Sequence, residues 1–98
     1  MNPDLNRQNL KGETALHILC KDLNYENIIL LLGKNPDLNI QDLNGDTALF
    51  IAVKKNDILI INLLLNECAD RNIKNNEGMT ALEYAIGKNY TKIIELFS

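Results

Sequence analysis

The sequence predicts an all-α repeat fold, an α-solenoid made of copies of one helix-turn-helix unit. The phrase Gly-x-Thr-Ala-Leu recurs at 12–16, 45–49 and 78–82, always 33 residues apart. A leucine triplet at 30–32 returns in phase at 63–65. A fixed period of this length is typical of one supersecondary unit that buries its apolar face against the next copy. Such a chain presents an extended surface, so the pattern favours binding over catalysis.

Length, charge and cysteine content limit the possible functions. A chain of 98 residues suits one domain, and its net charge of -3 gives no global attraction to nucleic acid or an anionic membrane. The longest apolar run, 58–65, is too short to span a bilayer, and no secretory signal opens the chain. Cys20 and Cys68 lack metal-ligand spacing, which favours two reduced thiols. We expect an intracellular protein, in the cytoplasm, with the nucleus or a secreted effector as alternatives.

The middle copy illustrates how one repeat folds. Residues 42–45 have turn chemistry, because an Asn-Gly pair favours a tight hairpin tip. Thr47 stands where a hydroxyl can cap a short helix, and Asn56 can end that helix in the left-handed conformation. Asp57 can then cap a second helix over 58–66, whose apolar residues share one face.

This order of hairpin, short helix, turn and longer helix resembles the ankyrin repeat. The family phrase is Gly-x-Thr-Pro-Leu-His-x-Ala, and the copies here read Gly-x-Thr-Ala-Leu followed by His17, Phe50 or Glu83. The resemblance implies a stack of β-hairpin/helix-turn-helix units within a single domain, 1–98. It divides the chain into the tail of a partial repeat (1–8), two repeats (9–41 and 42–74) and a truncated C-terminal repeat (75–98).

Several residues have structural roles that the resemblance implies. They are the hairpin glycines, the helix-start residues and the asparagines that bond hairpin backbones: Gly12, Thr14, His17, Asn39, Gly45, Thr47, Asn72, Gly78 and Thr80. Thr80 with Glu83 forms a capping-box pattern. Leu23 and Cys68 stand where the family usually has a left-handed glycine, so we expect strain of about 1 kcal/mol at each, or a rearranged turn.

The sequence offers no catalytic or metal-binding constellation. His17 is the only histidine, no nucleophile and carboxylate accompany it, and Cys20 reads as a core residue. Asp4, Asp37 and Asp70 are one repeat apart, which is too far for one calcium ion. We therefore expect no enzyme activity, metal, cofactor or small-molecule substrate.

The positions that vary most in the family, and that line its concave groove, are the candidate contact surface for a protein partner. On the hairpin tips they include Leu10, Lys11, Glu13, Leu43, Asn44, Asp46 and Met79. On or beside the inner helix ends they include Lys21, Lys54, Lys55, Lys74 and Lys88. We expect exposed apolar tips above a positive floor with an acidic rim, which would suit a peptide bearing apolar and acidic residues. A merely solvated face is the alternative.

Two functions follow from this reading. The first is a non-catalytic protein–protein interaction module, with a partner of unknown identity and no affinity for nucleic acid or membrane. The second is a structural spacer or fragment of a longer array whose binding surface lies elsewhere. The first copy has no polar outer face, so we expect Ile18, Leu19 and Leu31 to be uncovered on their inner side.

Overall fold

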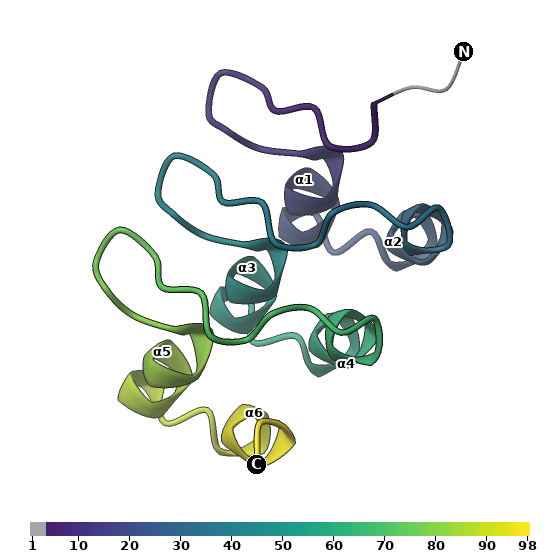
Figure 1. Ribbon diagram of the computed structural model, residues 1–98. Coiled ribbons are helices and arrows are strands. Elements are labelled where there is room, and N and C mark those ends of the chain that lie inside the picture. The colour runs from purple at the N-terminus through teal and green to yellow at the C-terminus, as the bar shows by residue number, and fades with distance from the viewer. Residues whose placement is uncertain (1–3) are drawn as a thin grey trace.

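The protein is a stack of three helix pairs. The computed structural model describes residues 4–98, and within that range it contains six helices and no β-strand. The helices are α1 (Ala15–Lys21), α2 (Tyr25–Leu32), α3 (Ala48–Lys54), α4 (Ile58–Asn66), α5 (Ala81–Lys88) and α6 (Thr91–Leu96). Figure 1 shows α1, α3 and α5 in one layer, α2, α4 and α6 in a second, and three long loops projecting to one side. The predicted all-α repeat solenoid is confirmed.

The first helix of each pair starts at a threonine cap. The hydroxyls of Thr14, Thr47 and Thr80 each accept a hydrogen bond from the amide three residues ahead, at 3.2–3.3 Å. Asn24 and Asp57 cap the second helices of the first two pairs in the same way. These caps satisfy amides that a helix start otherwise leaves without a partner, which is why the caps recur with the 33-residue period.

Left-handed residues connect the helices. Leu23, Asn56 and Asn89 have φ values of 54°, 54° and 58° between the two helices of each pair. Asn35 and Cys68 have φ values of 56° and 64° after the second helix of the first two pairs. Leu23 and Cys68 thus keep the left-handed turn expected of a glycine instead of rearranging it, at a cost of about 1 kcal/mol each.

The core lies between the two layers and is densest around the middle pair. Every residue from 48 to 53 is buried, because α3 packs against both α1 and α5. Ile28, Ile60 and Ile93, from the three helices of the second layer, complete this core. Among residues 4–98, no helix is long and apolar enough to cross a membrane.

Among residues 4–98, the N-terminal end of the stack is partly open. Ile18 on α1 is 40 % exposed, and together with Leu31 it lines a hollow of about 440 Å³ that residues 4–9 partly cover. Leu19 and Leu31 differ from the expectation, because both are half-buried and pack against the core cluster, although Leu31 also lines the hollow. The first three residues of the predicted segment 1–8 lie outside the described residues.

The long loops turn tightly without forming a strand ladder. In the middle loop the Asp42 N–H donates to the Asp46 carbonyl at 2.9 Å, and Asp42 Oδ1 accepts from the amides of Asn44 and Asp46. The loops that begin at Asn9 and Asn75 repeat this pattern. Side-chain acceptors inside the turn thus take over bonds that a regular hairpin would make between strands.

Neighbouring loop tips contact one another, which explains two of the three repeated glycines. The Leu43 N–H donates to the Lys11 carbonyl at 3.0 Å. A Cβ added to Gly12, which has a φ of 74°, would stand only 2.8 Å from that Leu43 nitrogen, and Gly45 is confined still more closely by Asn76. A Cβ at Gly78 meets nothing within 4 Å, so only its φ of 78° favours glycine there.

Asparagine side chains link successive loops on the other side of the stack. Asn6 Oδ1 accepts from the Asp37 N–H at 2.8 Å, and Asn39 Oδ1 accepts from the Asp70 N–H at 2.9 Å. The expectation that Asn72 makes the same bond is wrong. Its backbone donates to Asp70, but the structure records no hydrogen bond of its side chain to any residue in 4–98. The described chain has no further loop opposite Asn72.

Candidate partner-binding groove

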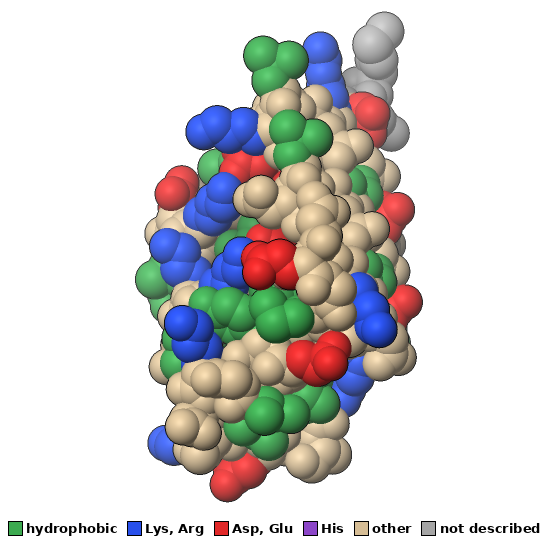
Figure 2. All heavy atoms as spheres, turned by 90° about the vertical axis from the view of Figure 1, so that its left-hand side faces the viewer, with side chains coloured by type: hydrophobic (Ala, Val, Ile, Leu, Met, Phe, Trp, Pro, Cys, Tyr) green, Lys and Arg blue, Asp and Glu red, His purple; other side chains and the backbone are tan. Residues whose placement is uncertain are grey.

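The candidate contact surface is the face formed by the loop tips and the α1, α3, α5 layer. Figure 2 shows this face, with hydrophobic side chains near its upper end and Lys and Arg side chains gathered along one side. Leu10 and Leu43, at successive tips, are 98 % and 68 % exposed. These two leucines therefore stand in solvent on the rim, as the sequence predicted.

A shallow hollow of about 300 Å³ lies beside these tips. It is lined by Lys21, Asp42, Asn44, Asp46, Ile51, Lys54 and Lys55. The loop of the second copy contributes the acidic and amide groups, and the ends of α1 and α3 contribute the lysines. The hollow thus joins two helix pairs, so its shape depends on how the pairs stack.

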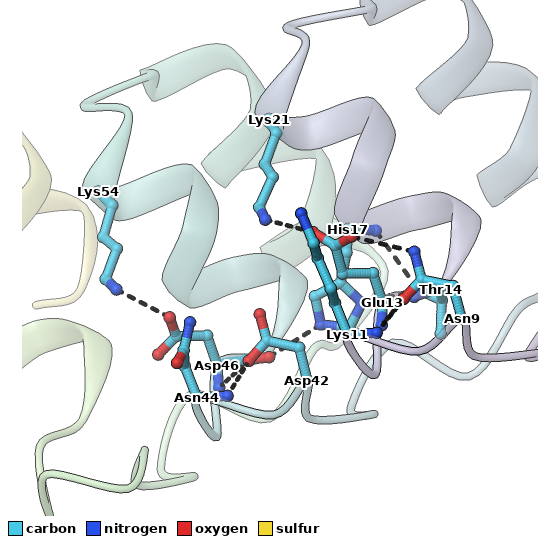
Figure 3. A network of polar contacts seen from close by, with 10 residues as sticks. All are labelled: Asn9, Lys11, Glu13, Thr14, His17, Lys21, Asp42, Asn44, Asp46 and Lys54. Atoms are coloured by element: carbon cyan, nitrogen blue, oxygen red, sulfur yellow. Dashed lines mark hydrogen bonds and ion pairs between the residues drawn. The ribbon is translucent and has the colours of Figure 1, made fainter.

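Two of the predicted lysines are held in ion pairs rather than free. Lys54 Nζ lies 2.8 Å from Asp46 Oδ2, and Lys21 makes the equivalent pair with Glu13 one copy earlier (Figure 3). The hydrogen bond from Lys21 is the main cause that lowers the pKa of the Glu13 carboxyl below its usual value. The same bond raises the pKa of Lys21.

The expectation of an acidic rim is therefore wrong at Glu13 and Asp46, and these two residues neutralise Lys21 and Lys54 of the expected positive floor. The side chains of Glu13 and Asp46 are buried, and each is neutralised by a lysine eight residues further along the chain. Lys11, Lys55, Lys74 and Lys88 are exposed, and the two ion pairs recorded within residues 4–98 do not include them. Asn44 is also exposed at its tip.

The third copy replaces both members of the ion pair. Met79 stands at the position of Asp46, and Gly87 stands at the position of Lys54. Met79 was expected to be exposed at a tip, but it is half-buried and packs against the core cluster. The third copy has no carboxylate here that needs a cation, and a flexible apolar side chain packs against the core instead. The Lys88 ammonium lies 5.7 Å from the ring centre of Tyr84.

His17 links two copies. Its Nδ1 accepts from the Thr14 N–H at 3.1 Å, so its Nε2 carries the proton and donates to the Asp46 carbonyl at 2.8 Å. The predicted hydrogen bond of His17 at the helix start is present, in the contact with Thr14. The sequence did not predict its bond to the Asp46 carbonyl of the next loop. Both ring nitrogens of this buried residue are in hydrogen bonds to the backbone, which favours a structural role over acid–base chemistry.

The two thiols differ in exposure. Cys20 is fully buried, and burial raises the pKa of its thiol to about 12. Cys68 is exposed. No group of three potential metal ligands occurs in the part of the chain that the structure describes. Neither thiol lies in the hollow, so the chemistry available there is hydrogen bonding, ion pairing and apolar contact.

One buried acceptor was not foreseen from the sequence. Asp46 is 2 % exposed, and its Oδ1 has no hydrogen-bond partner among residues 4–98. The sequence did contain a signal for it. The residues 33 positions before and after Asp42 are both asparagines, Asn9 and Asn75. Only the second loop has an acid there, next to a second buried acid.

Comparison with known families supports the reading of the repeats. A family model of ankyrin repeats, in three copies, matches residues 22–98. No match was found among curated proteins.

Proposed function

Because the chain belongs to the ankyrin repeat family, whose members are generally non-catalytic protein-interaction modules, we propose that it binds a protein partner through its groove and loop tips. The observation that carries this proposal is the exposure of Leu10 and Leu43 on successive loop tips, with Leu43 between two residues that line the hollow. Two large apolar side chains held in solvent beside a concave, mixed-charge surface are typical of an interface.

The two kinds of residue contribute differently to binding. Leu43 can bury most of its side chain under a partner, so it supplies affinity and slows dissociation. Lys55 lines the hollow but is in neither ion pair, so its charge chiefly steers the encounter and sets the salt dependence of the association rate.

The test is a double variant, Leu43→Ser with Lys55→Glu, used to capture partners from the native cell. We expect weaker capture than with the wild type and an unchanged helical circular-dichroism spectrum, because both side chains are exposed. Leu59→Ser with Lys92→Glu is the matched control, since it makes the same changes at exposed sites on α4 and α6. Recovery of the same partners by the groove variant would refute the proposal.

A spacer within a longer array is the second candidate. The observation that favours it is the apolar hollow beside Ile18 and Leu31 at the N-terminal end of the stack. A preceding repeat fused there would bury these side chains and raise the melting temperature. An unchanged melting temperature would count against this role, whereas unchanged capture by the groove variant would favour it.

A further inference from the structure

The second loop lacks a hydrogen-bond donor that the first loop has. In the first loop the Glu13 carboxylate accepts from Lys21 and, through Oε1, from Asn9 Nδ2 at 3.0 Å. In the second loop Asp46 Oδ2 accepts from Lys54, while the buried Oδ1 has no partner in residues 4–98. The amide is missing because Asp42 replaces the asparagine.

Asp42 cannot supply the missing bond as a carboxylate. An ionised aspartate only accepts, and Asp42 Oδ1 already accepts from the amides of Asn44 and Asp46. Figure 3 shows the Asp42 carboxylate between the Glu13–Lys21 pair and the Asp46–Lys54 pair. Two acidic side chains, both largely buried, therefore line one hollow with acceptor capacity to spare.

The charges around the hollow select a neutral donor. Three lysines line it, and three carboxylates lie in or beside it: Lys21, Lys54, Lys55, Glu13, Asp42 and Asp46. A cationic group would meet the lysines and an anionic group the carboxylates, so neither sign is favoured. The first loop shows which neutral donor fits, because there the side-chain carboxamide of Asn9 donates to Glu13, the carboxylate equivalent to Asp46.

We propose that the partner inserts the side-chain carboxamide of an asparagine or glutamine into this hollow, where it donates to Asp46 and Asp42. This inference rests on the proposed function and names the chemistry that the same groove recognises. The Lys54 side chain pairs with Asp46 Oδ2 but is 37 % exposed, so its flexible stem can shift while the ammonium stays on Oδ2 and leaves Oδ1 to the amide. Leu43 follows Asp42 directly, so an apolar residue of the partner would flank the amide.

The test selects peptides from a random-sequence display library on the immobilised wild-type protein. We expect enrichment of an Asn or Gln next to an apolar residue. The variant Asp42→Asn with Asp46→Glu reproduces the Asn9 and Glu13 pair of the first loop. Its own asparagine amide should then donate to the carboxylate, so that the acceptor is no longer available to a peptide. We call it the filled variant. It should bind a selected, fluorescently labelled peptide at least tenfold more weakly in anisotropy titrations. Asp37→Asn is the control, because it changes the net charge equally on a loop segment outside the hollow.

Replacing the peptide amide by an isosteric leucine should weaken binding to the wild type and leave binding to the filled variant unchanged. Enrichment of Lys, Arg, Asp or Glu instead would overturn the amide inference, and so would equal binding to the wild type and the filled variant. If Leu43→Ser still abolished capture in those cases, the groove proposal would stand. If the Leu43→Ser variant captured the same peptides as the wild type, both the groove proposal and the amide inference would be overturned.

Discussion

Asn39→Ala and Asn72→Ala form a matched pair that isolates one hydrogen bond between repeats. Both asparagines are exposed, both donate their backbone N–H to an aspartate two residues earlier, and both precede an isoleucine. Only Asn39 also accepts, through Oδ1, from the next loop, at 2.9 Å from the Asp70 nitrogen. The local consequences of the two substitutions should therefore cancel, leaving the contribution of that bond.

The expected difference in the free energy of unfolding is about 1 kcal/mol, the typical net value of one intramolecular hydrogen bond. For a domain of this size, that corresponds to a difference in melting temperature of about 4–8 °C. Asn72→Ala should lie within about 0.5 kcal/mol of the wild type, as surface changes usually do. Thermal and urea unfolding followed by circular dichroism measure both values. Equal destabilisation by the two variants would refute the idea that this side-chain bond couples the copies.

Further expectations follow from the helix caps, the acid–lysine pairs and the thiols. Thr47→Ala should lower the free energy of unfolding by about 1 kcal/mol in urea titrations, because α3 loses its cap. The hydrogen bond from Lys21 lowers the pKa of the Glu13 carboxyl in the folded protein. Glu13 therefore contributes its full stabilisation of the fold above its usual pKa of 4.5, and this contribution is lost as the pH falls through the folded pKa. Glu13→Gln should therefore flatten the acid limb of the pH–stability profile, and an unchanged limb would contradict this. A thiol reagent should label Cys68 in the native protein and Cys20 only after unfolding, as mass spectrometry can show. Cys68→Gly should raise the melting temperature by relieving a φ of 64°, and a decrease would show that the thiol side chain contributes more than the strain costs.

The sequence predicted the fold because each local signal repeats in phase. Thr47 as a cap, Asn56 as a left-handed residue and the helix at 58–66 all lie where one copy read by itself placed them. These features depend on neighbours within a few residues. The 33-residue period then fixes the stacking, because each apolar face can be covered only by the next copy.

The candidate site was predicted less well because its contacts join a loop to a later part of the following helix. The pairing of Asp46 with Lys54 spans eight residues across a loop–helix boundary, which no helical periodicity describes. The expected exposure of Met79 was wrong for a related reason, because its side chain packs against core residues that its position on a loop does not reveal. The bond from His17 to the Asp46 carbonyl depends on how the copies stack, which sequence spacing does not specify.

The acid–lysine pair also determines where the copies can be exchanged without damage. A chimera that moves only residues 81–87 into the place of 48–54 would bring Gly87 opposite Asp46 and leave a buried carboxylate without its cation. A crossover at Gly45 instead transfers the acidic residue and its lysine together. The unit of recombination in this protein therefore runs from loop glycine to loop glycine, and modular designs built from it should be joined at those glycines.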